Sequence, residues 1–320
     1  MNSDPLYNIL NPQLNDVFRL GKELMNRSRN TLGSTHKGGT EDRRFRSFYG
    51  ISAITAIDVW GRLEGEDLVP AGGGGRFLYL LWTLMFFKLY SVETELCAHA
   101  GGAYGAVDPK TFRKWCWPMA HALAELEYSV SPSIPTIDQI YLDKRYIGDQ
   151  NHDCLLSVDG TDFRIQLVHN NVRAFWSYKF KADGLRYEVA LSILNGDICW
   201  INGPYPPGLW NDNMIFDNLL VHMLDENERV EADDGYSGSA PRYVKCPRNL
   251  ASTEEQRVLA QRVMSRHETV NRRFKQFQIL KQVFRHDVSL HQVVFTAIAV
   301  LTQISIENGD DLFDIDEYHN

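Results

Sequence analysis

Cysteine is scarce in this chain, and the motifs in which cysteine usually functions are missing. Five cysteines occur among 320 residues, far apart in the sequence, without a C-x-x-C pair or a Cys/His cluster. Such an odd, scattered set supports neither a disulfide framework nor a zinc site. We therefore expect reduced cysteines in the core of an intracellular protein.

Long apolar runs are also missing. The most apolar stretch, FLYLLWTLMFF at 77–87, is shorter than the roughly 20 residues that cross a bilayer, and Lys88 follows it. The first ten residues, MNSDPLYNIL, do not read as a secretory signal because no basic region precedes an apolar run. We expect a buried helix near 76–90 and no membrane partner.

The chain has no overall excess of basic charge, since its formal net charge is −8. The excess of acidic residues is unevenly distributed. Residues 307–320 carry six acidic and no basic side chains, whereas residues 251–306 carry eight basic and four acidic ones. A local basic face can bind nucleic acid on an acidic protein, so the net charge does not exclude DNA as a partner.

The order of patterns predicts an α/β protein with a helical region before it. We expect five parts: a flexible segment at 1–40, a helical region at 41–130, a boundary at the proline-containing stretch 131–138, a domain of strands and helices at 150–306, and an acidic tail at 307–320. The composition, 44% hydrophobic and 23% charged, is that of an ordinary globular protein.

The helical region contains a short helix, a glycine turn and a longer helix over 91–126. Asp108 is suited to cap the longer helix and Pro109 to be its first residue. This pattern is compatible with a DNA-binding helix-turn-helix in which Arg113 and Lys114 lie near the start of the second helix. A plain helical bundle is the alternative.

The second half of the chain mixes strand and helix patterns. Two strand patterns, 185–194 and 197–202, flank the Asn195-Gly196 pair, which predicts a tight hairpin. The other expected elements are a strand at 154–159, a helix at 211–224, a short strand at 228–236, a long helix at 253–284 and a final helix at 289–306.

Two of these strands are expected to end on aspartates, at Asp159 and at Asp233-Asp234. Successive strand residues face opposite sides, so one of Asp233 and Asp234 points away from the other. In the long helix, Glu268 lies about 140° from Val263, among bases that include Arg272 and Lys275. The expected apolar stripe of this helix consists of Val263, Val270, Phe274 and Phe277. A solvated pair between Glu268 and Arg272 is the simpler interpretation.

Three carboxylates without a Cys or His cluster favour a hard divalent cation, Mg²⁺ or Mn²⁺. Two such ions can activate an attacking oxygen and stabilise the leaving oxygen of a phosphodiester. Basic side chains beside the acids would hold a polyanionic backbone. The residues themselves therefore predict phosphodiester chemistry at Asp159, Asp233 and Glu268.

Three sequence blocks, VDGTDFRI, DDGY and RHETVNRRFKQF, resemble those of PIF/Harbinger-like DDE transposases, the DDE superfamily endonucleases. The D-G-T block matches 159–161, and the D-x-G-Y block matches 233–236, with Asp233 as the ligand and Asp234 as the filler. Glu268 matches the helical acid, 35 residues after Asp233. The stretch GLWNDNMIF resembles a middle element that carries Asp212, but an asparagine precedes Asp212 where much of the family has histidine, and its role is left open.

The resemblance implies an RNase H-like mixed sheet flanked by helices. It implies that Asp159, Asp233 and Glu268 are the catalytic residues and the ligands of about two Mg²⁺ (or Mn²⁺) ions. It also implies double-stranded DNA as substrate, with transposon terminal repeats, a Myb-like partner protein, a homodimer and the nucleus as further expectations. Asp162 is an alternative ligand, although we favour a surface role for it at the strand exit.

The stretch NNVRAFWSYKF at 170–180 and the lysine after it place bases among aromatic residues, and we expect Lys179 and Lys181 to contact the DNA backbone. Two other functions compete with the transposase interpretation. One is a domesticated DNA-binding protein that has lost catalysis. The other is a metal-dependent phosphohydrolase of the same fold that acts on RNA.

Overall fold

The computed structural model describes residues 5–9, 11–26, 31–71, 76–126, 154–167, 173–193, 196–246 and 254–312, with the backbone alone over 255–264. The expected boundary at 131–138, Asn195 of the expected turn and most of the acidic tail lie outside these residues. The chain forms two compact units. The first comprises Met1–Ser129, Lys275–Lys281 and Val293–Asp310, and the second comprises Val130–Phe274, Gln282–Gln292 and Asp311–Asn320. Most of the final helix therefore belongs to the helical unit and not, as expected, to the domain at 150–306.

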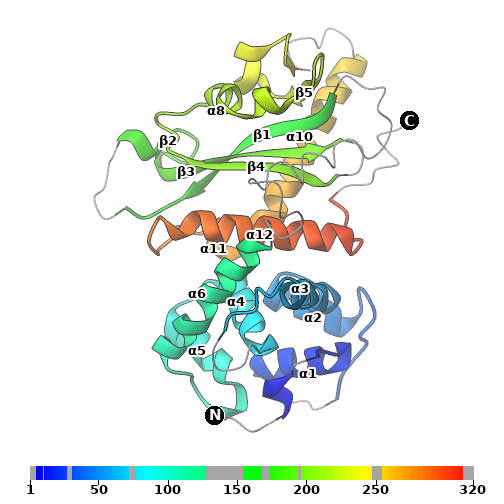
Figure 1. Cartoon of the computed structure of the whole chain (residues 1–320), viewed down its shortest axis with the longest axis vertical. Helices are drawn as coiled ribbons and strands as arrows, with labels where there is room; N and C mark the ends of the chain where they lie inside the picture. The colour runs from blue at the N-terminus through cyan, green and yellow to red at the C-terminus, as the bar shows by residue number, and fades with distance from the viewer. Residues whose placement is uncertain are drawn as a thin grey trace. The chain divides into compact units, whose positions relative to one another are not determined.

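The first unit is helical (Figure 1). Its helices are α1 (Leu14–Leu24), α2 (Thr40–Tyr49), α3 (Ala53–Gly65), α4 (Phe77–Leu89), α5 (Glu93–Gly101), α6 (Pro109–Glu125), α11 (Gln278–Lys281) and most of α12 (Leu290–Glu307), with short 3₁₀ turns η1 (Pro5–Asn8) and η2 (Gly102–Tyr104). Helix α1 lies inside the segment that we expected to be flexible. Its side chains Val17, Phe18 and Leu20 are buried, so this part of the segment is a core element.

Helix α4 is the centre of this unit, as its sequence predicts. Every side chain from Phe77 to Phe87 is buried, which is the pattern of a helix surrounded by protein. Helix α12 is long and apolar enough to cross a membrane by composition, but 78% of its length is buried in the protein. A mostly buried helix of this kind is typical of a protein core. All five cysteines are buried thiols, as expected.

Helices α5 and α6 occupy the region expected to form a helix-turn-helix. Asp108 caps α6 by accepting a hydrogen bond from the Lys110 backbone amide at 2.9 Å, and Pro109 is its first residue. Both predictions about this helix start are confirmed. Arg113 and Lys114 are exposed on α6, and the Arg113 guanidinium pairs with Glu93 at 3.0 Å.

The second unit contains a mixed sheet of six strands flanked by helices (Figure 1). The strands are β1 (Cys154–Arg164), β2 (Trp176–Ser177), β3 (Ala182–Ser192), β4 (Ile198–Tyr205), β5 (Arg229–Ala232) and β6 (Val244–Lys245). Strand β1 lies between β3, to which it is antiparallel, and β5, to which it is parallel. Strands β3 and β4 form the predicted antiparallel pair, and β6 lies parallel to β5.

Strand β1 is longer than the sequence suggested. We expected it to end at Asp159, but it continues to Arg164 by pairing with β3. What ends beside Asp159 is the parallel pairing with β5, whose last pair is Val158 with Ala232. Asp159 therefore lies within one strand, yet at the carboxyl end of a parallel strand pair.

Each face of this sheet is covered differently. On one face, Leu156 and Val158 belong to an apolar core with Phe216 and Tyr236, from helix α8 (Asp212–Asn218) and the 3₁₀ turn η6 (Asp234–Ser239). Helix α8 and the 3₁₀ turn η5 (Leu220–Met223) replace the single helix expected at 211–224. The remaining 3₁₀ turn, η4 (Arg173–Phe175), precedes β2.

Helix α10 (Glu254–Lys275) covers the other face of the sheet through polar contacts. The Ser157 hydroxyl and His267 Nε2 lie 2.9 Å apart, and Arg266 Nη1 donates to Glu231 Oε2 at 2.9 Å. All four side chains are buried. The helix expected at 253–284 is interrupted after Lys275 and resumes as α11.

Candidate functional site

Asp159 and Asp233 come together at the carboxyl end of the parallel β1–β5 pair. Asp159 follows the last residue of β1 that is paired with β5, and Asp233 follows the last residue of β5. Asp233 also caps η6, because its Oδ1 accepts a hydrogen bond from the Gly235 amide at 2.8 Å. The carboxyl ends of parallel neighbours meet at one sheet edge, and this explains why residues 74 positions apart in the sequence share a site.

Asp212 is the third carboxylate at this position. It is the first residue of α8, which Asn211 caps by accepting from the Met214 amide at 2.8 Å. A Cβ atom at Gly160 would lie 2.0 Å from Asp212 Oδ1. A Cβ atom at Gly235 would lie 3.2 Å from Asp212 Oδ2 and 2.9 Å from Asp233 Oδ1. The glycines of the D-G-T and D-x-G-Y blocks therefore leave room for the Asp212 carboxylate.

The three carboxylates influence one another. Burial, and after it the charge of Asp233, raises the pKa of the Asp159 carboxyl to about 7, and Asp212 adds to the rise while Lys179 opposes it. Burial also raises the pKa of Asp212, against Arg186, with Asp162 and Asp233 as further causes of the rise. Neighbouring carboxylates thus disfavour the ionisation of Asp159 and Asp212, and a cation bound among them would stabilise the site.

Asp162 does not have the surface role that we favoured. Its side chain is only 1% exposed, and it accepts hydrogen bonds from Arg186 Nε at 2.7 Å, from Arg186 Nη2 at 3.1 Å and from the Ser177 hydroxyl at 2.5 Å. Arg186 Nη1 also lies 3.3 Å from Asp212 Oδ1. Asp162 is thus a buried partner of Arg186, which joins it to the acidic site.

Glu268 is exposed on α10, next to the buried His267. In the part of the chain that the structure describes, no hydrogen bond or ion pair joins Glu268 to the three aspartates. Helix α10 nevertheless packs on the sheet face from which Asp159 projects, because His267 contacts Ser157 and residues 157 and 159 share a face. Asp234 is exposed beside Asp233.

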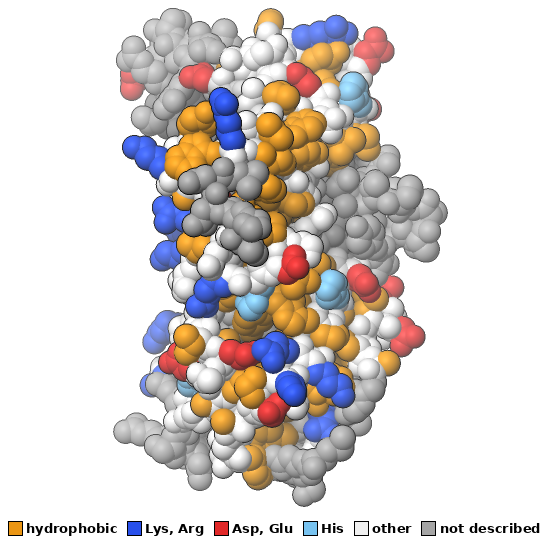
Figure 2. Space-filling view, turned by 90° about the vertical axis from the view of Figure 1, so that its left-hand side faces the viewer, with side chains coloured by type: hydrophobic (Ala, Val, Ile, Leu, Met, Phe, Trp, Pro, Cys, Tyr) orange, Lys and Arg blue, Asp and Glu red, His pale blue; other side chains and the backbone are white. Residues whose placement is uncertain are grey.

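The candidate DNA-binding bases are distributed over several elements. Lys179 and Lys181 are exposed between β2 and β3, and Arg272 is exposed and Lys275 half-buried on α10. Lys179 alone among these influences the pKa of Asp159 and Asp212, which places its ammonium group near the acids. On the face shown in Figure 2, Lys and Arg side chains follow the left edge of the view and others gather in its lower part, where Asp and Glu side chains lie among them.

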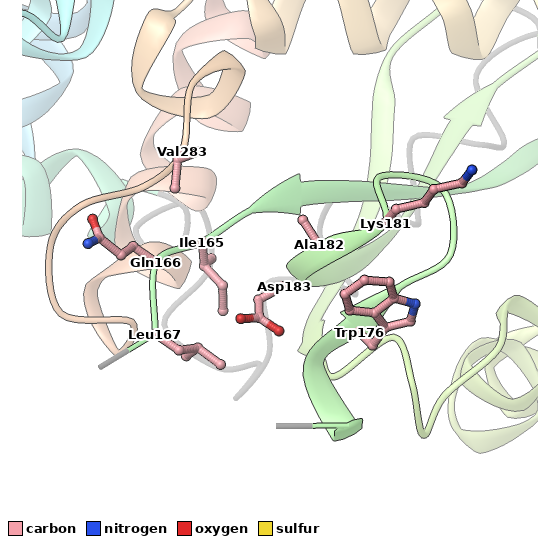
Figure 3. A pocket seen from close by; sticks show the side chains of 8 residues that line it. All are labelled: Ile165, Gln166, Leu167, Trp176, Lys181, Ala182, Asp183 and Val283. Atoms are coloured by element: carbon pink, nitrogen blue, oxygen red, sulfur yellow. The ribbon is translucent and has the colours of Figure 1, made fainter. Parts of the chain in front are cut away.

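A separate open cavity of about 350 Å³ lies at the start of β3 (Figure 3). Its lining includes Ile165, Trp176, Lys181 and Asp183, and Figure 3 shows Asp183 between Ile165 and Trp176. None of the carboxylates around Asp159 lines it. The cavity and the acidic site are therefore distinct features, and both border the β2–β3 turn that carries Lys179 and Lys181.

The donor set of the acidic site suits a hard divalent cation, because it consists of carboxylate oxygens with no sulfur or imidazole. Asp212 Oδ1 is buried and has no hydrogen-bond partner among the described residues, although Arg186 lies near it. Within those residues, no group of three or more His, Cys, Asp or Glu side chains stands in a ready metal-binding arrangement. The residues present fit Mg²⁺ or Mn²⁺ by chemistry, and cation binding requires rotation of the carboxylates toward a common point.

Glu188 is a buried acid near this site, and no sequence pattern indicated it. It pairs with Gly160 across the β1–β3 ladder, and its Oε2 accepts from Trp200 Nε1 at 3.0 Å. Burial raises the pKa of Glu188 to about 8, against the Trp200 hydrogen bond and with the charge of Asp212 as an additional cause. Glu188 is therefore largely neutral at pH 7.

Glu188 predicts that the metal-free protein loses stability as the pH rises from 6.5 to 8. The folded state keeps the Glu188 proton up to about pH 8, whereas the unfolded chain has already lost it. The free energy of unfolding therefore falls with pH, by at most about 1.4 kcal/mol per pH unit for one group. Asp159 adds to this loss up to about pH 7. Burial lowers the pKa of His267 and His291 to about 3, whereas these groups titrate near pH 6.5 in the unfolded chain, so their opposite contribution levels off just above pH 6.5 and offsets only the start of the decline.

Urea unfolding at pH 6.5 and pH 8 in EDTA measures this loss. Glu188→Gln keeps the acceptor for Trp200 and removes the titration, so its stability should change less between the two pH values than that of the wild type. An equal decline in both proteins would show that Glu188 does not carry the effect.

Comparison of the chain with protein-family models, with curated proteins and with solved structures gives no match in any of the three. The function is therefore inferred from the sequence blocks and from the chemistry of the site.

Proposed function

We propose that this protein is a metal-dependent DNA endonuclease and strand transferase of the DDE type. The observation that carries the proposal is the meeting of Asp159 and Asp233 at one end of the β1–β5 pair, with burial and mutual repulsion raising the pKa of Asp159. A cluster of like charges is costly without a cation and is therefore unsuited to a purely structural role. The mixed sheet flanked by helices supports the RNase H-like fold that the sequence blocks imply.

Asp159, Asp233 and Glu268 would hold the divalent cations. Glu268 is included because it follows His267 on the helix that packs on the Asp159 side of the sheet. When bound, the cations supply an activated attacking oxygen and stabilise charge on the leaving oxygen. Lys179, exposed beside the acids, neutralises a phosphate of the substrate and so orients the phosphodiester. No covalent protein intermediate is required, and this agrees with the absence of a nucleophile motif in the sequence.

The proposed substrate is double-stranded DNA, with transposon terminal repeats as the specific sites. A Myb-like partner protein, a homodimer and residence in the nucleus belong to the same proposal. They depend on the family resemblance and on no contact in this chain.

A nicking assay on supercoiled plasmid tests the proposal. The purified protein is expected to relax or linearise the plasmid with Mg²⁺ or Mn²⁺ and to leave it intact with EDTA. A clean, folded preparation that cuts with neither ion would overturn the enzyme assignment.

A non-catalytic DNA-binding protein is the second candidate. It is favoured by the position of Glu268, which in the described residues has no contact with the aspartates. Under this alternative the protein binds duplex DNA with the same affinity in EDTA and in Mg²⁺, and it never cleaves.

Lys179 and Lys181 are expected to bind the DNA backbone whether the protein is an endonuclease or a non-catalytic DNA-binding protein. The double variant Lys179→Glu, Lys181→Glu should bind duplex DNA more weakly, because two exposed cations become anions beside the acidic site. The slope of log K against log salt should fall by about two, one for each lost phosphate contact. Fluorescence anisotropy at several salt concentrations measures both quantities, and an unchanged affinity with an unchanged slope refutes the contact.

A further inference from the structure

The fixed position of Asp212 is not explained by its role in α8. The helix needs only the Asn211 cap at its start, and an exposed aspartate would serve its first turn equally well. Instead the Asp212 carboxylate is only 26% exposed and fills the space that side chains at Gly160 and Gly235 would occupy. The Gly235 position lies within 3.2 Å of both the Asp212 and the Asp233 carboxylates, so these two groups are close neighbours.

A buried hydroxyl next to this cluster also lacks a partner. Tyr236 is fully buried, and its Oη has no hydrogen bond to any described residue. Burial, and after it the charges of Glu188, Asp212, Asp159 and Asp233, raises the pKa of this hydroxyl well above its ordinary value. A buried hydroxyl left unsatisfied costs about 1–3 kcal/mol, and the charges that act on this one include those of all three carboxylates of the site.

Arg186 holds Asp212 in this place. Its guanidinium is fixed by two hydrogen bonds to Asp162, and the Ser177 hydroxyl fixes Asp162 in turn. The remaining nitrogen, Nη1, faces Asp212 Oδ1 at 3.3 Å and the Trp210 carbonyl at 3.4 Å. A planar fork bound in this way presents its third nitrogen in a set direction, which a lysine ammonium could not do.

We propose that Asp212 is a divalent-cation ligand of the Asp159–Asp233 site and that Arg186, held by Asp162, is the residue that positions it. This inference rests on the proposed function and adds to it a ligand that the three sequence blocks do not assign. Arg186 serves as the counter-charge of Asp212 before a cation binds and directs the carboxylate toward Asp233 when one does.

Calorimetric titration of the full chain with Mn²⁺, without DNA, tests the ligand. Asp212→Asn keeps the shape of the side chain and should weaken Mn²⁺ binding by about tenfold or more. Asp234→Asn removes an exposed charge beside Asp233 and is the matched control, with an expected change of less than about twofold. Asp212→Glu keeps the charge but not the fit between the glycines, so it should also weaken binding if Asp212 is a ligand.

The outcomes separate this inference from the proposed function. If the wild type does not bind Mn²⁺, the enzyme assignment fails. If the wild type binds Mn²⁺ and Asp212→Asn binds it equally well, Asp212 is not a ligand and the enzyme assignment stands.

Arg186→Gln tests the positioning role by the sign of its effect. Loss of a positive charge beside the acids would by itself tighten Mn²⁺ binding, whereas loss of the positioning contact should weaken it. Arg186→Lys is the second variant if Arg186→Gln does not fold, because it keeps the charge, loses the fork and should likewise bind Mn²⁺ more weakly. Tighter or unchanged Mn²⁺ binding in the folded variant overturns the positioning role.

Discussion

Replacement of Asp159 by asparagine is expected to abolish Mg²⁺-dependent plasmid cleavage, with a loss of rate on the order of 10³ or more. Asp159 is paired with β3 and directly follows the last parallel pair of β1 with β5, and Asp233, Asp212 and Lys179 all lie near enough to affect its pKa. It is therefore the carboxylate best placed to contact every cation in the site. Asparagine fits the same space and removes only the charge and one oxygen donor.

The same variant should fold and bind DNA as the wild type does. In EDTA its free energy of unfolding at pH 8 should equal or exceed that of the wild type, because a carboxylate that is repelled by its neighbours has been removed. Asp234→Asn, an exposed substitution beside the site, should cleave at the wild-type rate. Cleavage by Asp159→Asn at a rate within about tenfold of the wild type would exclude Asp159 as a cation ligand.

Replacement of Glu231 by glutamine is expected to lower the free energy of unfolding by about 3–5 kcal/mol. Glu231 and Arg266 form an ion pair at 2.9 Å, and both residues are less than a tenth exposed. In this variant the Arg266 charge remains buried between α10 and the sheet but has lost the Glu231 carboxylate. Because a domain is stable by only about 5–15 kcal/mol, this substitution should shift the urea midpoint strongly.

A double variant tests whether the loss of stability comes from the buried charge that Glu231→Gln leaves behind. Glu231→Leu with Arg266→Met replaces both charges by apolar groups and should recover most of the lost stability. Glu226→Gln, at an exposed position before β5, should leave the midpoint unchanged within about 0.5 kcal/mol. A loss of less than 1 kcal/mol in Glu231→Gln would show that the pair does not hold α10 on the sheet.

The sequence predicted most elements because their apolar patterns are local. The uniformly apolar helix α4, the β3–β4 pair and the capped start of α6 were each specified by residues within a few positions. The apolar stripe of the long helix was also correct at Val270 and Phe274, both of which are buried. Periodicity and caps are short-range signals. They therefore predict individual helices and strands well, but they predict poorly how these elements pack together.

Polar contacts between elements far apart in the sequence could not be predicted. Asp162 looked like a surface acid because its partner Arg186 is 24 residues away and only the β1–β3 register brings them together. Arg266 and His267 are polar residues of the long helix that no sequence pattern assigned to the interior, yet both bind buried polar groups of the sheet. Their burial depends on Glu231 and Ser157, which no local pattern connects to the helix.

The structure explains two motif glycines through Asp212. A glycine after Asp159 and another after Asp234 have no turn requirement with positive φ in this structure, since neither adopts one. What they share is the need for space beside Asp212. Two motif glycines with ordinary backbone angles therefore indicate a side chain that approaches both, but its identity depends on the position of α8.

Crystals of the protein grown with Mn²⁺ and measured at the manganese absorption edge test the central claim most directly. The expected result is anomalous density bound by the carboxylates of Asp159 and Asp233, with Glu268 completing the site. Manganese bound only elsewhere on the chain, or no anomalous density at Asp159 at an ion concentration that supports cleavage, would contradict it.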